Sequence, residues 1–116
     1  MSEIELDELS RRLGQVTVVD VRADYEYDGT VGAQCDPRQG HIPGSLHLHV
    51  DDLLLLRADE VGERLGLAAG QEVVVYCHSG SRSAFAAQVL RQLGYEARNY
   101  AGSWHEWSRT ELPLET

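Results

Sequence analysis

The amino-acid sequence predicts an α/β fold in which an open parallel β-sheet is flanked by helices on both faces. Residues 16–21 and 72–77 are rich in valine and too apolar for half-exposed strands, which indicates strands buried on both faces. Helical patterns alternate with the strand candidates, an order typical of parallel sheets. The chain has 116 residues, enough to bury a core without staples, so we expect one domain over residues 1–116.

The individual elements follow from periodicity and from capping or breaking residues. Leucines at i, i+3 and i+7 in residues 6–13 predict an amphipathic helix that ends at Gly14. Asp51 or Asp52 is expected to cap a helix carrying residues 53–56. The other expected elements are a helical turn over 23–28, an irregular loop over 28–40, a short strand after the turn at 43–44, a helical piece over 59–66, a strand over 96–101 and a last short helix from 102.

The strand at 72–77 runs into a helix that begins at Ser81 or Ser83 and ends at Gly94. One apolar stripe is expected to bury this helix against the sheet. Its members are Phe85, Val89, Leu90 and Leu93.

Composition excludes several functional classes. The net charge is −9, which disfavours nucleic acid and anionic membranes as partners. All ten basic residues are arginine, and a chain without lysine has no Schiff-base chemistry, pyridoxal phosphate site or P-loop. No apolar stretch approaches the length of a membrane span, and the first residues are acidic rather than secretory in pattern. We therefore expect a cytoplasmic protein with reduced thiols, no membrane association and no cofactor.

Cys77 stands where the valine-rich strand ends and the next helix begins, a position where parallel sheets bind ligands. The six residues 77–82 must turn the chain, and so tight a turn directs successive N–H groups inward as an anion-binding nest. Gly80 supplies a position free to take positive φ. The nest and the helix dipole favour thiolate, so Cys77 is predicted to be acidic and nucleophilic.

Other side chains of this loop have candidate binding roles. Arg82 carries a permanent planar charge suited to a sulfonate or thiosulfate group. The hydroxyls of Ser79, Ser81 and Ser83 are potential donors to a bound sulfur or oxygen atom. His78 lies beside the nucleophile, where its charge would tune the thiol pKa unless its side chain points to solvent.

The loop "CHSGSRS" resembles the active-site loop of the rhodanese (sulfurtransferase) family, whose small members often have C-x-x-G-x-R-S before a helix. Three further segments resemble family motifs in the family's order: "VVDVR" (18–22), "GHIPGS" (40–45) and "NYAGSWHEW" (99–107), the last with Ala101 where a glycine is usual. The resemblance runs from about residue 4 to residue 113. It implies a rhodanese-like fold for the predicted sheet.

The resemblance also implies a mechanism. The thiolate of Cys77 would take the outer sulfur of a donor such as thiosulfate or a persulfide and hold it as an enzyme persulfide. It would then pass the sulfur to cyanide, a thiol or a sulfur-relay protein. By the same resemblance, the N–H groups of residues 78–82 stabilise the persulfide, and Arg82 orients the donor.

Two alternatives remain beside a thiosulfate sulfurtransferase. In the first alternative, the domain is a non-catalytic module that carries or senses persulfide for a partner protein. A phosphatase or arsenate reductase on the same fold is disfavoured because such loops have five residues between cysteine and arginine. Here only residues 78–81 lie between Cys77 and Arg82, which suits one sulfur atom better than a tetrahedral phosphate.

Three further residues of the motifs are expected to be structural, with substrate contact as the alternative. Asp20 is predicted to accept N–H bonds from the following loop. Arg22 is predicted to pair with Glu26, four residues on. His41 is predicted to hold its loop by a hydrogen bond.

No metal site is expected from the sequence. His41, His47 and His49 form a trio, and the last two would share one strand face, but no cysteine or carboxylate pattern completes a ligand set. Trp104 and Trp107 are expected in the core.

Cys35 lies in an insertion that separates Arg22 from Gly40 by eighteen positions. If loop 28–40 folds over the active-site loop, Cys35 would attack a Cys77 persulfide and release sulfide, leaving a disulfide. The alternative is an incidental cysteine on a surface loop.

Overall fold

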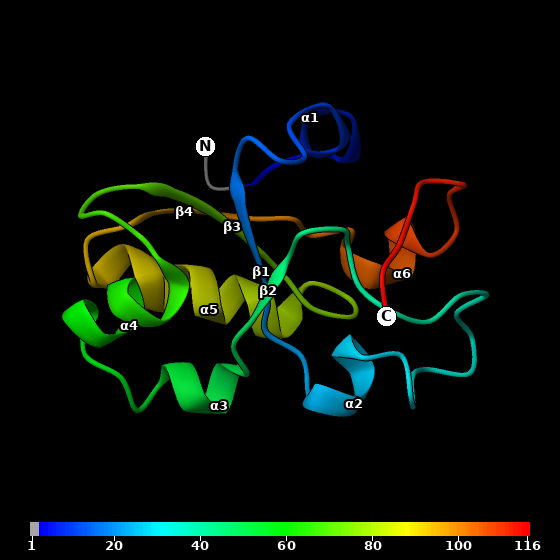
Figure 1. The fold of residues 1–116 in the computed structure, drawn as a ribbon, viewed down its shortest axis with the longest axis horizontal. Coiled ribbons are helices and arrows are strands. Elements are labelled where there is room, and N and C mark those ends of the chain that lie inside the picture. The colour runs from blue at the N-terminus through cyan, green and yellow to red at the C-terminus, as the bar shows by residue number, and fades with distance from the viewer. Residues whose placement is uncertain (1–2) are drawn as a thin grey trace.

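The computed structural model describes residues 3–116 and has a parallel four-stranded sheet at its centre (Figure 1). The strands are β1 (Thr17–Asp20), β2 (Leu46–His47), β3 (Glu72–Tyr76) and β4 (Glu96–Asn99), in the spatial order β2-β1-β3-β4. Every pair of neighbours is parallel. Val73, Val74 and Val75 of the central β3 are fully buried, as expected for a strand covered on both faces.

Helices cover both faces of this sheet, as the sequence predicts. They are α1 (Leu6–Arg11), α2 (Asp24–Tyr27), α3 (Val50–Leu53), α4 (Ala58–Leu65), α5 (Ser81–Gln92) and α6 (Ser103–Trp107). One core cluster joins α3, α4 and α5 to one face of the sheet, and a second joins α1 and α6 to the other. Successive β3 residues alternate between the clusters: Val73 and Val75 belong to the first, Val74 and Tyr76 to the second.

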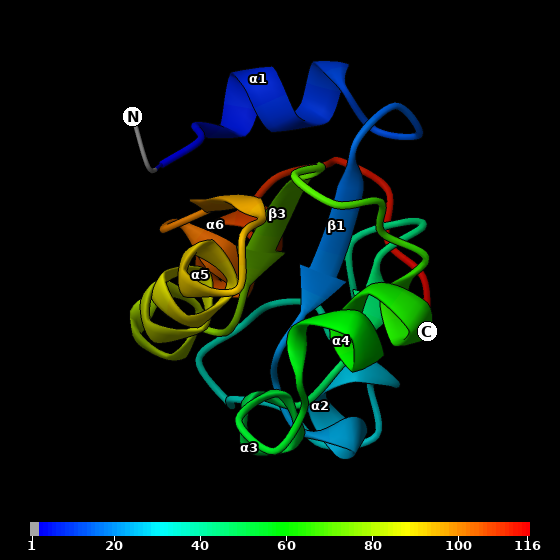
Figure 2. The same ribbon diagram turned by 90° about the vertical axis from the view of Figure 1, so that its left-hand side faces the viewer.

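The C-terminal ends of the strands point away from α1. In Figure 2, β1 points from α1 toward α2 and α3. Asp20 at the end of β1 lies in register with Tyr76 at the end of β3. The segments that follow these two strands therefore leave the sheet side by side, which brings the first motif next to the cysteine loop.

Two details of the helices differ from the sequence prediction. Of the expected stripe, Leu90 is buried and Val89 and Leu93 pack partly buried against the core, but Phe85 is 49% exposed. Helix α5 also buries Ser83, Ala86 and Ala87. Small side chains on that face let the helix approach the sheet closely, so the stripe turns toward them. Helix α3 covers Val50–Leu53 rather than residues 53–56, because His49 caps it in place of Asp51 or Asp52. The His49 ring accepts a hydrogen bond from the Asp51 N–H at 3.0 Å.

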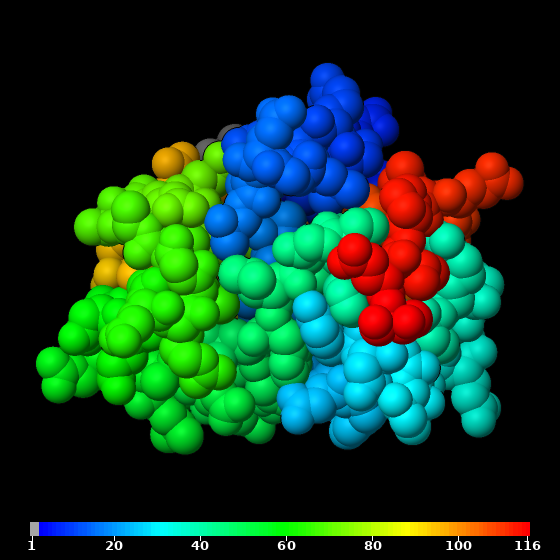
Figure 3. All heavy atoms as spheres, in the orientation of Figure 1, coloured from blue at the N-terminus to red at the C-terminus, as the bar shows by residue number. Residues whose placement is uncertain are grey.

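The predicted loop 28–40 is irregular and packs against the C-terminal segment. Arg38 donates hydrogen bonds to the carbonyls of Trp107, Ser108 and Leu112. His41 forms an isolated bridge with Glu115. Figure 3 shows the C-terminal residues resting on this part of the surface. None of the described helices is both long and apolar enough to cross a bilayer.

Candidate active site

Cys77 follows β3 directly and is fully buried. The first two residues of α6 bind both of its backbone polar groups. Its N–H donates to the Ser103 hydroxyl at 3.1 Å, and its carbonyl accepts from the Trp104 N–H at 2.9 Å. The residue is therefore held by the third motif of the sequence as well as by its own strand.

The sulfur of Cys77 accepts hydrogen bonds from its own loop and from the first turn of α5. The Gly80 N–H lies 3.1 Å from Sγ, and the Ser83 hydroxyl lies 3.4 Å from it. Burial raises the pKa of the thiol, but the Ser83 hydroxyl and the loop N–H groups outweigh burial and bring the pKa below its ordinary value. The predicted thiolate-stabilising nest is thus present, and of the three candidate serines Ser83 supplies the hydroxyl.

The backbone conformation and the close packing at position 80 both require glycine. Its φ of +97° is a conformation that residues with a Cβ rarely adopt. A Cβ at this position would also lie 2.5 Å from the Ala101 carbonyl oxygen. The Asn99 side-chain amide, at the end of β4, donates to the Gly80 carbonyl at 3.3 Å and so stabilises the turn. The neighbouring Ser79 and Ser81 are exposed.

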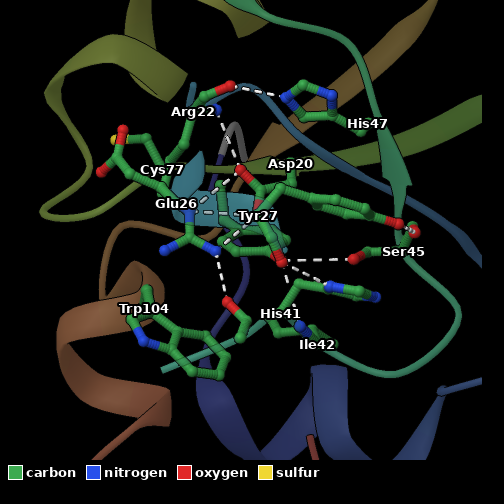
Figure 4. A network of polar contacts seen from close by, with 12 residues as sticks. Asp20, Arg22, Glu26, Tyr27, His41, Ile42, Ser45, His47, Cys77 and Trp104 are labelled. Carbon is green, nitrogen blue, oxygen red and sulfur yellow. Dashed lines mark hydrogen bonds and ion pairs between the residues drawn. The ribbon is translucent and has the colours of Figure 1, made fainter. Parts of the chain in front are cut away.

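Asp20 and Arg22 form a buried ion pair beside the cysteine loop (Figure 4). The Asp20 carboxylate accepts the Arg22 N–H at 2.9 Å and its guanidinium at 2.7 to 3.0 Å. Arg22 also donates to the Gly40 carbonyl and lies 5.2 Å from the Trp104 ring centroid. The expectation that Asp20 accepts loop N–H bonds is met by the Arg22 N–H. With its guanidinium enclosed, Arg22 is a structural residue that links three of the four motifs.

The predicted pairing of Arg22 with Glu26 is wrong. Glu26 instead accepts two hydrogen bonds from Arg82, at 3.0 and 3.3 Å. The i,i+4 argument assumed a continuous helix, but α2 begins only at Asp24, and the extended Arg22 turns back onto Asp20. The Arg82 side chain is 37% exposed, so it remains open to an incoming anion at the rim of the loop.

The three histidines of the first half have separate structural tasks. His41 Nδ1 lies 2.7 Å from the Tyr27 carbonyl, consistent with the predicted loop-holding bond, and its ring stacks on Tyr27 at 3.8 Å. The His47 ring also stacks on Tyr27, with the ring centroids 4.8 Å apart. His49 caps α3 and lies outside β2, so the predicted shared strand face is wrong: β2 ends at His47.

His78 and Cys35 meet at the edge of the site. The His78 imidazole is turned toward loop 28–40, with Nε2 2.9 Å from a carboxylate oxygen of Asp36. Cys35 is exposed, and its thiol donates a weak hydrogen bond to the other oxygen of Asp36 at 3.8 Å. Both cysteines are free thiols. The role of Cys35 as a resolving cysteine stays a prediction.

Two residues of the site were missed at the level of sequence. Ser103 is buried, takes a φ of +54°, and connects the Cys77 N–H to the Tyr100 carbonyl. Glu26 orients Arg82. Ser103 lies within the "NYAGSWHEW" motif, which was the available signal. Glu26 was assigned to Arg22, and nothing in the sequence points to Arg82 as its partner.

Comparison with known proteins agrees with this geometry. A model of the rhodanese-like domain matches residues 5–110. The chain therefore belongs to the rhodanese-like domain family.

Particular relatives carry sulfurtransferase names. A thiosulfate sulfurtransferase of Corynebacterium glutamicum is 36% identical over 119 residues, which cover 89% of this chain and 39% of the relative. The chain thus spans about two fifths of that relative's length. A crystal structure named as a probable thiosulfate sulfurtransferase superposes with a TM-score of 0.87 at 48% identity, covering 99% of this chain and 48% of the other. The human single-domain sulfurtransferase TSTD1 gives a TM-score of 0.72 at 30% identity, covering 97% of this chain and 99% of that one.

Proposed function

We propose that this protein is a sulfurtransferase that moves a sulfane sulfur from thiosulfate or a persulfide donor to cyanide, a thiol or a protein acceptor. The observation that carries the proposal is the environment of the Cys77 sulfur. It is buried, accepts hydrogen bonds from the Gly80 N–H and the Ser83 hydroxyl, and has a lowered pKa. A lowered pKa increases the fraction of thiolate, which is the nucleophilic form.

In the proposed first step, the Cys77 thiolate attacks the outer sulfur of thiosulfate. A new S–S bond forms on Cys77, the S–S bond of the donor breaks, and sulfite leaves with the electron pair. The terminal sulfur of the persulfide carries the negative charge, which the N–H groups of residues 78–82 would stabilise. The Gly80 N–H, 3.1 Å from Sγ, supports this role. Arg82, held at the rim by Glu26, would attract and orient the anionic donor.

In the proposed second step, an acceptor attacks the outer sulfur. Cyanide forms thiocyanate, or a thiolate forms a new persulfide, and the thiolate of Cys77 leaves with the bonding pair. No cofactor takes part, since the sulfur changes partner without net oxidation. The full overlap with a human single-domain sulfurtransferase supports the proposal that one domain of this size suffices.

Counting sulfur transferred per chain separates an enzyme from a persulfide carrier. With thiosulfate and cyanide both in excess, the proposal predicts thiocyanate far in excess of the protein. A carrier loaded in advance would release only one equivalent and fail to reload. Absence of thiocyanate, with a persulfide donor tried as well as thiosulfate, would reject the enzymatic function. Hydrolysis of an aryl phosphate by the same preparation would favour the phosphatase alternative.

A further inference from the structure

Beside the active-site loop, four side chains with metal-binding atoms converge from three distant segments. Their ligand atoms all lie within 4.8 Å of one another. Two come from loop 28–40, one follows the active-site cysteine, and one lies on α6. They are Cys35, Asp36, His78 and His105.

The carboxylate of Asp36 has an unsatisfied oxygen in this cluster. Asp36 is 93% buried, and its Oδ2 has no hydrogen-bond partner. His78 Nε2, also buried and without a hydrogen bond, lies 2.9 Å from that oxygen. The two atoms are within ion-pair distance, but no hydrogen bond joins them and neither has another hydrogen-bond partner among the described residues. A cation bound to both would satisfy them together.

The surrounding contacts hold the cluster in place. Arg109 donates to the other Asp36 oxygen, Oδ1, at 3.0 Å and to the Cys35 carbonyl at 2.8 Å. The His105 N–H donates to the His78 carbonyl at 2.9 Å, which ties α6 to the active-site loop. Arg109 thus occupies Oδ1 and leaves Oδ2 for another partner. An outer group that orients a ligating carboxylate is characteristic of protein metal sites.

The distances suit a four-coordinate ion. The four donor atoms lie within 4.8 Å of one another, and His78 Nε2 is 2.9 Å from Asp36 Oδ2. Cys35 Sγ and His105 Nδ1 each lie 3.8 Å from Oδ1, the oxygen that Arg109 binds, so they must turn toward Oδ2. Tetrahedral zinc, with bonds of about 2.0 to 2.3 Å, places its ligand atoms about 3.3 to 3.8 Å apart. The cluster therefore needs only small side-chain rotations, and the more exposed Cys35 and His105 are free to make them.

We propose that Cys35, Asp36, His78 and His105 form a binding site for Zn²⁺. One sulfur, one oxygen and two nitrogen donors select a borderline metal such as zinc, whereas Ca²⁺ and Mg²⁺ require oxygen ligands. Binding releases the thiol proton of Cys35 to solvent as the thiolate bonds to the metal. The ion would fasten loop 28–40 to the residue after Cys77. The site is independent of the proposed sulfur transfer.

The test uses Cys77→Ser protein, in which Cys35 is the only thiol. Co²⁺ serves as the spectroscopic probe. The proposal predicts one Co²⁺ per chain, with the visible bands of tetrahedral cobalt and an ultraviolet thiolate-to-cobalt charge-transfer band. One equivalent of Zn²⁺ should remove both. Adding Cys35→Ser should abolish the charge-transfer band, and adding His105→Gln should weaken Zn²⁺ binding at least about tenfold.

His49→Gln in the same background is the matched control, because His49 lies outside the cluster and should leave Zn²⁺ affinity unchanged. Circular dichroism checks that each variant is folded, and both altered ligands are exposed enough to be replaced safely. The proposal is overturned if the Cys77→Ser protein binds no Co²⁺, or if the charge-transfer band survives the addition of Cys35→Ser. It is also overturned if His49→Gln weakens Zn²⁺ binding as much as His105→Gln.

Discussion

Replacing Ser83 by alanine removes the one side-chain hydroxyl that donates to the Cys77 sulfur, at 3.4 Å, while leaving the backbone of the nest unchanged. A hydrogen bond to a charged group contributes about 1.5 to 3 kcal/mol. One pKa unit corresponds to about 1.4 kcal/mol. The pKa of Cys77 should therefore rise by about 1 to 2 units in Ser83→Ala. Because the thiolate is the reactive form, the acid limb of sulfur loading should move to higher pH by the same amount.

The pH dependence of alkylation by iodoacetamide, a neutral reagent, measures this pKa directly when Cys35 has been replaced by serine. Ser81→Ala is the matched control: Ser81 is exposed and keeps its N–H when replaced, so the pKa should stay at the parent value. The reasoning fails if Ser83→Ala leaves the pKa unchanged, or if Ser81→Ala raises it equally.

Three further substitutions probe the rest of the site. Gly80→Ala should lower the free energy of unfolding in urea by at least about 2 kcal/mol, because φ is positive and the new Cβ would lie 2.5 Å from the Ala101 carbonyl oxygen. Unchanged stability would contradict this and show that the loop relaxes. Asp20→Asn should cost about 3 to 5 kcal/mol by leaving the Arg22 charge buried without its partner, and a loss below about 1 kcal/mol would contradict the buried ion pair. Arg82→Gln should slow loading from thiosulfate about tenfold but leave alkylation by iodoacetamide nearly unchanged, so equal slowing of both would assign Arg82 to the thiol rather than to the donor.

The parts of the site that could be predicted from sequence are those set by local chemistry. A run of valines indicates burial on both faces, which predicted β3 as a buried strand. A cysteine at the end of such a strand, followed by glycine and a helix, sets the nest around Sγ. The positive φ of Gly80 follows from the same tight turn.

The parts that could not be predicted depend on contacts between distant segments. Arg82 binds Glu26, which lies 56 positions earlier in the chain. Arg22, the predicted partner of Glu26, pairs with Asp20 instead. Ser103 reaches Cys77 only because the chain after β4 turns back over β3. The metal-ligand cluster has the same origin, since loop 28–40 and α6 meet only in the folded protein.

The exposed Phe85 shows where helical periodicity alone misplaces a residue. Helical periodicity places Phe85 on a plausible apolar stripe, yet α5 turns its small residues inward. Close packing against a sheet favours alanine and serine over a bulky ring where the backbones approach. Hydrophobicity alone therefore identified the helix and its buried Leu90, Val89 and Leu93, but wrongly added Phe85 to them.

The most direct test of sulfur transfer through Cys77 is the intact mass of the protein after thiosulfate, and again after cyanide. The wild type should gain one sulfur atom and lose it to cyanide, whereas Cys77→Ser should do neither. The account is contradicted if Cys77→Ser gains the sulfur, or if the wild type remains unmodified by both thiosulfate and an organic persulfide.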